Sequence, residues 1–321
     1  MELSQEYLSK LERCVSGTSN VYVLDLSWHL HRSYYTFRNM SISMGGYERP
    51  TGHIYGVLST IKMIREIDKD SCIILTQDGI PLNRIQLVSE TSEIGYKEGR
   101  EELEYDFYRD IPYIKALCCV LPKVFWAYNE DKECDDEMYA LSRHLQLVSY
   151  PGKCYVYSGD NDLLQAIDEK TVVIRNVVRN EKRFDEITDE VVRTNVKFTK
   201  KFNGVDTRHI TNYRAICGDS SDKLRGISRF PRDIAVLVAM SSEDIRKGFS
   251  FVPITDREKK YISVLKDNME IVKRNYNLMK LQSDYEVKLY KPIVKKEKLN
   301  EVLRTFKLKV FEGYLRREGI L

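Results

Sequence analysis

The stretch at residues 132–138, Lys-Glu-Cys-Asp-Asp-Glu-Met, places four acids within five consecutive positions. Behind it, apolar residues recur at spacings of three and four, as on one face of a helix: Met138, Leu141, Leu145 and Val148. The acids therefore begin a helix, where the macrodipole favours negative charge. Alone, such an acidic first turn is equally typical of an ordinary solvated helix, so its meaning depends on the rest of the chain.

Other acids directly follow short apolar runs. The runs at 21–24, 72–76 and 153–158 predict buried strands, and the acids behind them are Asp25, Asp78, Asp160 and Asp162. A fourth strand is predicted at 171–174, and helices are predicted at 27–35, 54–67 and through Leu163-Leu164. Strands alternating with helices predict an α/β domain with a mostly parallel central sheet, and the carboxyl ends of its strands would gather these acids at one edge.

Composition sets wider limits. The 321 residues carry 51 basic and 48 acidic side chains, a net charge of +3 that excludes neither nucleic acid nor other partners. Seven cysteines without CxxC spacing suggest neither a zinc site nor a disulfide framework. The first 14 residues predict an amphipathic polar helix and not a signal peptide, and no apolar run reaches the length of a membrane span. We therefore expect a soluble protein of a reducing compartment.

Gathered carboxylates need cations. Two of them about 4 Å apart repel by roughly 4 kcal/mol at a near-surface effective dielectric. Oxygen ligands select hard dications, namely magnesium, manganese or calcium. A carboxylate cage with two magnesium ions is suited to phosphoryl transfer, in which one ion activates water and both clamp the phosphodiester. Structural calcium binding is the alternative, although the EF-hand spacing is absent.

The segment 203–237 predicts two helices joined by a tight turn at 217–227, Cys-Gly-Asp-Ser-Ser-Asp-Lys-Leu-Arg-Gly-Ile. Asp219 and Asp222 lie in this turn and could join the metal cage. The arginines Arg225, Arg229 and Arg232 suit contacts to a phosphate backbone without base readout. An ordinary helical hairpin with surface arginines remains the alternative.

Five motifs in this order resemble the 5′-nuclease family, which includes the 5′-nuclease domain of bacterial DNA polymerase I, flap endonucleases and phage 5′–3′ exonucleases. They are Asp25-x-Ser27-x-x-Leu30-x-Arg32-x-Tyr34, Pro50-Thr51-Gly52-x-Ile54-Tyr55-Gly56, Glu133-Cys134-Asp135-Asp136, Ser158-Gly159-Asp160-x-Asp162 and Gly218-Asp219-Ser220-Ser221-Asp222. The resemblance covers about residues 21–237, and the C-terminal part looks most like the T-even phage ribonuclease H type.

The resemblance implies a PIN-like nuclease core at 1–200, with a helical arch at about 80–130. It also implies a helix-turn-helix-type DNA-binding region and a C-terminal helical segment at 201–321. It further implies a cage for two Mg²⁺ ions, which Mn²⁺ can replace. The implied ligands are Asp25, Asp78, Glu133, Asp135, Asp136, Asp160, Asp162, Asp219 and Asp222.

The implied arch carries cations for the scissile phosphate. Lys97 and Arg100 share one helical face, Arg84 is a third candidate catalytic cation, and Tyr96 can stack on an unpaired base. Arg32 is a further DNA-binding candidate. Without the acidic cage, a solvated helix would explain these arch residues equally well.

The sequence departs from the family at residues 222–232. Asp222-Lys223 stands where the family has Asp-Asn, and Ser228-Arg229-Phe230-Pro231-Arg232 replaces a glycine-rich hairpin. We expect arginine side chains there to take over contacts that backbone amides make elsewhere. Further on, apolar residues at helical spacing from Val302 to Tyr314 predict a docked basic C-terminal helix.

The sequence thus predicts a metal-dependent 5′-nuclease that acts at 5′ ends, nicks or flaps of DNA, and on RNA of RNA–DNA hybrids as a wider possibility. Two alternatives stay open, a PIN-type ribonuclease and a non-catalytic protein that binds branched DNA. We expect a monomer in the cytoplasm of a bacterium or a phage-infected cell, without membrane association and with any replication partner unknown.

Overall fold

The computed structural model describes residues 3–89, 106–178 and 181–321, and it is built around a seven-stranded sheet. The sheet order is β11-β5-β4-β1-β6-β7-β8. Its strands are β1 Val21–Asp25, β4 Cys72–Thr76, β5 Val124–Ala127, β6 Cys154–Tyr157, β7 Thr171–Val178, β8 Arg183–Ile187 and β11 Leu289–Tyr290. The five middle strands are parallel, whereas β8 and β11 pair antiparallel at the two edges. The predicted mixed, mostly parallel sheet is confirmed.

Helices cover both faces of this sheet, which explains why β1 and β4 are apolar and buried throughout. Side chains alternate along β1, so that Val21 and Val23 join one apolar cluster and Tyr22 and Leu24 join the other. The apolar cluster that contains Val21 and Val23 lies against α1 Gln5–Val15 and α6 Cys134–Leu147. Five helices cover the apolar cluster that contains Tyr22 and Leu24: α2 Leu26–Thr36, α3 Gly52–Ile67, α5 Ile111–Cys119, α13 Lys296–Thr305 and α14 Lys309–Arg317.

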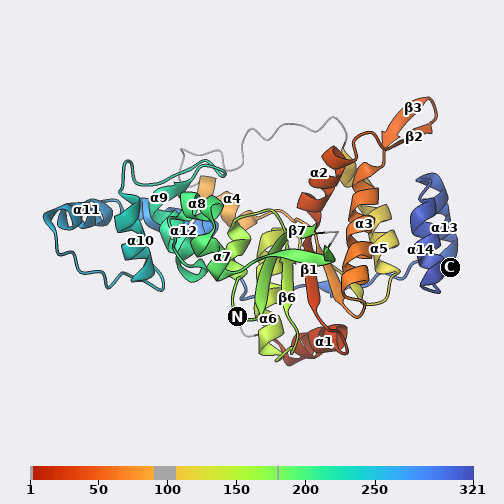
Figure 1. The fold of residues 1–321 in the computed structure, drawn as a ribbon, viewed down its shortest axis with the longest axis horizontal. Helices are drawn as coiled ribbons and strands as arrows, with labels where there is room; N and C mark the ends of the chain where they lie inside the picture. The colour runs from red at the N-terminus through yellow and green to blue at the C-terminus, as the bar shows by residue number, and fades with distance from the viewer. Residues whose placement is uncertain (1–2, 90–105, 179–180) are drawn as a thin grey trace.

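A lobe of shorter helices extends to the left of the sheet in Figure 1. It contains α7 Asp189–Thr194, α8 Val196–Phe202, α9 Ile210–Cys217, α10 Arg232–Met240, α11 Asp256–Asp267 and α12 Met269–Met279. α9 packs against both α10 and α12. After α12 the chain returns to the sheet as β11, beside β5. The predicted pair of helices at 203–237 corresponds to α9 and α10.

Within the expected arch range of about 80–130, the structure describes α4 Leu82–Ser89, and it places α5 and β5 in the packed core. The helix predicted through Leu163-Leu164 is only a 3-10 turn at Asp162–Ala166, because the chain re-enters the sheet a few residues later. The remaining arch residues, 90–105, lie outside the described residues, so the arch itself stays a prediction.

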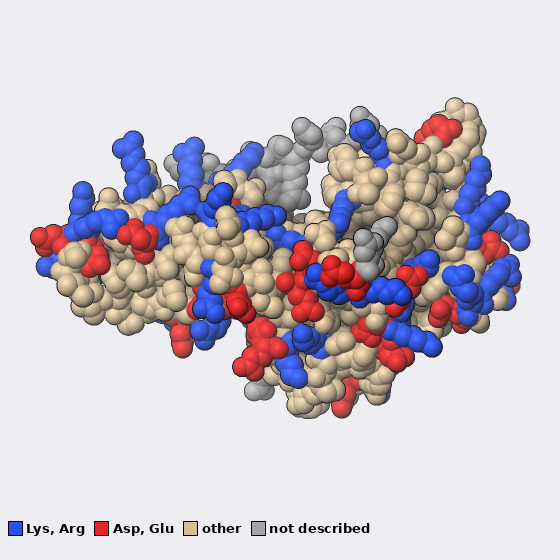
Figure 2. Space-filling model, in the orientation of Figure 1, with Lys and Arg blue, Asp and Glu red and all other residues tan. Residues whose placement is uncertain are grey.

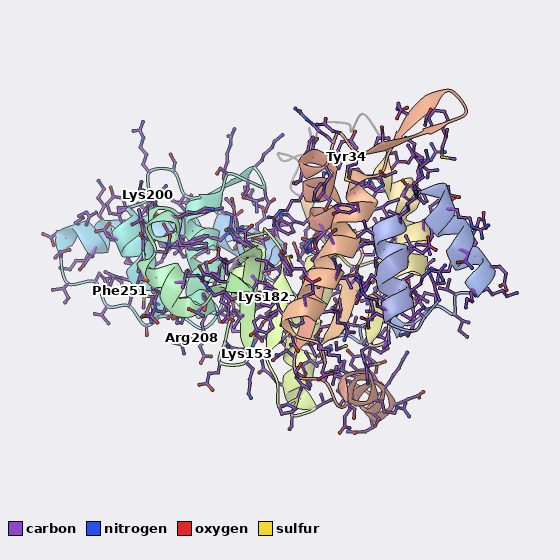
Figure 3. The ribbon with its side chains drawn as sticks, turned by 45° about the vertical axis from the view of Figure 1, so that its right-hand side comes forward. Tyr34, Lys153, Lys182, Lys200, Arg208 and Phe251 are labelled. Atoms are coloured by element: carbon purple, nitrogen blue, oxygen red, sulfur yellow. The ribbon has the colours of Figure 1, made fainter. Side chains whose placement is uncertain are left out.

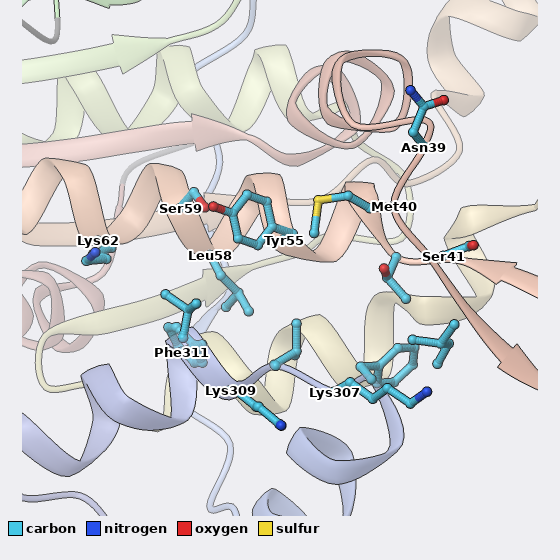
Figure 4. Close-up of a pocket in the computed structure, with 15 residues that line it drawn as sticks. Asn39, Met40, Ser41, Tyr55, Leu58, Ser59, Lys62, Lys307, Lys309 and Phe311 are labelled. Carbon is cyan, nitrogen blue, oxygen red and sulfur yellow. The ribbon is translucent and has the colours of Figure 1, made fainter.

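The single C-terminal helix predicted from Val302 to Tyr314 was also wrong. The chain bends between α13 and α14, where Lys307 adopts a left-handed backbone with φ of 51°. The bend rotates the second helix, so that Phe311 and Tyr314 are buried while Val310 is 65% exposed. Between α14 and α3 lies a cavity of about 350 Å³, into which Tyr55, Leu58 and Phe311 project (Figure 4). Among the described residues, apolar and basic side chains dominate the lining of this cavity.

Two further features bear on the predictions. Gly45-Gly46 forms the tip of a hairpin between β2 Ser41–Met44 and β3 Tyr47–Pro50. No helix in the described parts of the chain is both long and apolar enough to cross a bilayer.

Candidate active site

The first acid cluster forms where β1, β4 and β6 end beside the start of α6. Asp25 ends β1 and begins α2, since its carboxylate accepts the backbone N–H of Trp28 at 2.9 Å. The hydroxyl of Ser158, at the end of β6, donates to the other oxygen of Asp25 at 2.6 Å. Asp78, beyond β4, accepts the backbone N–H of Cys134 at 2.9 Å and the Ser27 hydroxyl. These bonds hold the strand ends and the α6 N-terminus together.

Four predicted ligands, Asp25, Asp78, Asp135 and Asp160, line one cavity of about 280 Å³ at this edge, and a fifth, Glu133, also lines it. Burial, together with the charges of neighbouring acids, raises the pKa of Asp25 to about 6. Burial likewise raises the pKa of Asp135 well above its ordinary value, helped by Asp160 and Asp25. Among the described residues, no lysine or arginine forms an ion pair with any of these four acids. We call this group the first cluster.

Cys134 lies inside the first cluster, although the sequence marked it only as part of a motif. Its thiol donates to Asp25, with the sulfur 3.5 Å from the carboxylate oxygen. Burial raises the pKa of this thiol well above its usual range, with Asp25 and Asp78 adding to the effect. Asp25, Cys134 and Asp135 can place ligand atoms within 4.8 Å of one another. Of these donors, hard dications prefer the carboxylate oxygens to the soft sulfur.

The second cluster consists of Asp162, Asp219 and Asp222, which can place carboxylate oxygens within 4.8 Å of one another. Asp162 begins the turn after β6, and Asp219 lies in the small ladder of β9 Gly218–Asp219 with β10 Leu224–Arg225. Gly218 is required there, because its φ is 78° and a Cβ would lie 2.3 Å from the nitrogen of Gly226. The structure thus brings the acids of the predicted turn to those of the sheet.

Arg214 on α9 binds two acids of the second cluster, one through each terminal nitrogen: Asp162 and Asp219. This arginine is only 2% exposed. Burial alone would raise the pKa of Asp219, but Arg214 and hydrogen bonds from Ser221 outweigh it and lower that pKa. Lys201 adds a second positive charge, with its Nζ 4.0 Å from Asp219. The two acid clusters therefore differ in their resident cations.

The last two predicted ligands, Glu133 and Asp136, form a buried ion pair with Arg84 of α4. One terminal nitrogen of Arg84 contacts Glu133, and the other lies 2.9 Å from Asp136. Asp136 also accepts the backbone N–H of Gln282 at 2.9 Å. Arg84 was expected beside the scissile phosphate. In the structure it ties α4 to the first turn of α6, and its catalytic role stays a prediction.

Of the remaining predicted DNA contacts, Tyr96, Lys97 and Arg100 lie outside the described residues. Arg32 is exposed, donates to the carbonyl of Arg175 at 2.7 Å and stacks on Trp28.

A groove of about 1210 Å³ runs beside the second cluster. Arg225 and Arg229 line it together with Lys223 and Arg274, whereas Arg232 points elsewhere and donates to the carbonyl of Lys200. Phe230 is buried against Tyr261 rather than forming an open phosphate loop. The view in Figure 2 shows Lys and Arg gathered along the upper edge of the left-hand lobe, where Figure 3 places Lys200. The lobe therefore presents a basic edge and a basic groove.

Sequence reasoning missed Arg214, Arg274, Lys201 and Glu137. Glu137 follows the predicted acids but is fully buried, and burial raises its pKa to about 9. The run of acids at 133–137 gave no indication that Glu137 would be the fully buried one. Arg214 appeared only as part of a helical segment, since nothing local links it to Asp162, 52 residues away.

Comparison with known proteins agrees with this geometry. A family model described as the 5′-3′ exonuclease, N-terminal resolvase-like domain matches residues 20–199, more than half of the chain. A 5′-3′ exonuclease of Aquifex aeolicus is 25% identical over 272 residues, which are 84% of each chain. DNA polymerase I of Synechocystis is 28% identical over 67% of this chain, which matches only 21% of that longer protein.

Solved structures share the fold. The T5 5′-exonuclease with bound zinc matches with a TM-score of 0.55 and 17% identity, over 91% of this chain and 98% of that one. Human GEN1 in complex with Holliday junction DNA matches with a TM-score of 0.52 and 13% identity, over 96% of this chain and 73% of GEN1. The finer likeness to T-even phage ribonuclease H stays a prediction. On the family match and this fold, the chain belongs to the 5′-3′ exonuclease family and is a nuclease.

Proposed function

We propose that this chain hydrolyses phosphodiester bonds at 5′ ends or flaps of DNA, with two divalent metal ions at the two acid clusters. One observation carries the proposal. Acids from three strand ends and one helix N-terminus converge on the same edge of the sheet, and a basic groove opens beside them. A protein that only bound branched DNA would gain nothing from buried carboxylates next to a polyanion, because they repel it.

The residues of the first cluster fit a hard dication. Their donors are carboxylate oxygens, and burial together with neighbouring acids raises the pKa values of Asp25 and Asp135, which disfavours their charged forms. Mg²⁺, with Mn²⁺ as a substitute, prefers such ligands. When bound, two such ions supply activation of water and stabilisation of the charge that develops on the phosphodiester. The T5 5′-exonuclease, which was solved with divalent metal, supports this assignment.

The chain's own residues position the metal ligands. Ser158 and the Trp28 amide fix both oxygens of Asp25, while Ser27 and the Cys134 amide fix Asp78. Because these donors come from different elements, the carboxylates are oriented before any ion binds, which reduces the cost of reorganisation.

DNA would lie across the basic groove and the basic upper edge of the lobe. Lys223, Arg225, Arg229 and Arg274 line the groove and suit phosphate oxygens rather than bases. GEN1 in complex with Holliday junction DNA, a protein of the same fold, supports this use of the surface. We further propose that Lys97 and Arg100 of the arch contact the scissile phosphate and that Tyr96 stacks on an unpaired base. The action on RNA–DNA hybrids, the monomeric state and the cytoplasmic location remain expectations.

The test is digestion of labelled 5′-flap, nicked and RNA–DNA hybrid substrates, with and without Mg²⁺, by the wild type and by Asp135→Asn. We expect cleavage near the 5′ junction of the flap that requires Mg²⁺ and is lost in Asp135→Asn, while binding of the flap persists. Cleavage of single-stranded RNA in preference to the flap would instead support the PIN-type ribonuclease. Flap binding without cleavage under any metal would support the non-catalytic alternative.

A further inference from the structure

Arg214 occupies a position that the proposed chemistry does not require. Its two terminal nitrogens bind Asp162 and Asp219, two of the three acids of the second cluster. The side chain is 3% exposed, so water screens these contacts little. Its Nε has no hydrogen-bond partner among the described residues, so the side chain's polar contacts there go to two candidate metal ligands, Asp162 and Asp219.

Arg214 compensates the charge of the second cluster without a metal. Its guanidinium is positively charged, since arginine keeps its proton in proteins, and it lies in ion pairs with Asp162 and Asp219. Lys201 faces Asp219 from α8 and adds a weaker positive charge. Arg84 pairs with Glu133, which also lines the first cavity, but Asp25, Asp78, Asp135 and Asp160 form no ion pair with an arginine or lysine in the parts of the chain that the structure describes. Thus one cluster needs an external cation and the other already holds one.

We propose that Arg214 is a resident cation that weakens metal binding at the second cluster and thereby sets the order in which the two sites fill. This inference rests on the proposed metal centre. A divalent ion entering the second cluster meets a guanidinium that already binds one oxygen each of Asp162 and Asp219. The guanidinium repels the incoming ion unless the ion displaces it, whereas none of Asp25, Asp78, Asp135 and Asp160 in the first cluster forms an ion pair among the described residues. The first cluster fills at low metal concentration, and the second fills only at higher concentration. Arg214 is a positioning residue, since it acts through the two acids.

The experiment is calorimetric titration of the DNA-free protein with Mn²⁺, comparing the wild type with Arg214→Met. We expect two unequal sites in the wild type. In Arg214→Met the weaker site should tighten by about tenfold or more, because a unit charge a few ångströms away is removed, and the stronger site should not change. Without metal the variant should melt at a lower temperature, and Mn²⁺ should raise its melting temperature more than that of the wild type.

Lys201→Met provides a second variant that carries less risk of unfolding, because Lys201 is exposed. It should tighten the weaker site by a smaller factor, while Lys200→Met, which removes an exposed neighbouring charge, should leave both sites unchanged. The inference is overturned if Arg214→Met folds and its weaker site is unchanged or lost. If Arg214→Met does not fold even with Mn²⁺, the two lysine variants decide. The inference is then overturned when Lys201→Met and Lys200→Met bind Mn²⁺ at the weaker site with the same affinity. A wild type that binds no Mn²⁺ would overturn the proposed metal centre itself.

Discussion

The two acid clusters lie at the same edge of the molecule, but their charges are compensated in different ways. In the first cluster, hydroxyl and amide groups hold Asp25 and Asp78, and burial raises the pKa of Asp25 to about 6. In the second, Arg214 binds two carboxylates and helps to lower the pKa of Asp219. Carboxylates of similar sequence context can therefore differ in whether they need a metal ion. The difference depends on one arginine contributed by a neighbouring helix.

The largest expected effect separates cleavage from DNA binding in the first cluster. Asp135→Asn should lower the single-turnover cleavage rate by several orders of magnitude, because a ligand for the reactive metal is lost. Flap binding should persist or tighten, since one acid that repels phosphate is removed. Quench-flow cleavage and fluorescence anisotropy measure the two quantities. A near-normal cleavage rate would exclude Asp135 from the metal centre.

The next effect concerns cations from outside the clusters. If Lys97 contacts the scissile phosphate, Lys97→Ala should reduce the saturated single-turnover rate by about a hundredfold to a thousandfold, as the loss of a transition-state donor commonly does. Flap affinity should change little. Should Lys97→Ala weaken binding and leave the saturated rate intact, Lys97 would be a backbone contact only.

Stability without metal should respond oppositely in the two clusters. Asp219→Asn should lower the free energy of unfolding by about 3 kcal/mol, because it breaks a buried ion pair and leaves Arg214 less compensated. Asp135→Asn should raise the free energy of unfolding, since it removes a charge that burial disfavours. Urea unfolding in EDTA measures both. Equal losses in the two variants would contradict the distinction between the clusters.

The pH dependence of stability should carry the mark of the first cluster. The pKa of Asp25 is about 6 in the folded protein and 3.8 ordinarily, so the folded state binds the proton more tightly. In metal-free protein, protonation of Asp25 therefore contributes up to about 3 kcal/mol to the free energy of unfolding. This contribution is fully present below pH 3.8 and is lost as the pH rises through 6. Comparing urea unfolding of the wild type and Asp25→Asn between pH 4 and 7 isolates it, because the variant should lack this loss. An unchanged pH profile in Asp25→Asn would argue against a raised pKa.

The smallest effect tests the groove beside the second cluster. Arg225→Ala should weaken flap binding and reduce the slope of its salt dependence by about 1, with a near-normal rate at saturation. Arg208→Ala is the matched control, because Arg208 lies low on the lobe in Figure 3, away from the basic upper edge. Anisotropy titrations over a series of salt concentrations measure the slope. The same loss of flap affinity in both variants would indicate general electrostatic attraction rather than DNA bound along the groove.

The sequence predicted the first cluster better than the second. Asp25 and Asp78 follow apolar runs, and the parallel pairing of β1 with β4 places such positions side by side. Arg214 could not be predicted, because its partner Asp162 is 52 residues away and its local pattern is that of any amphipathic helix. The bend at Lys307 could not be predicted either, because no local sequence pattern marks it. A left-handed lysine without glycine or proline gives no turn signal, and tertiary packing of Phe311 decides the direction of α14.

The most direct test of the unequal clusters is the anomalous diffraction of crystals soaked at increasing Mn²⁺ concentrations. At low concentration we predict one anomalous peak, among Asp25, Asp78, Asp135 and Asp160. At high concentration a second peak should appear among Asp162, Asp219 and Asp222, together with a shift of the Arg214 guanidinium away from at least one carboxylate. A first peak at the second cluster, or a fully occupied second site with Arg214 unmoved, would contradict the account.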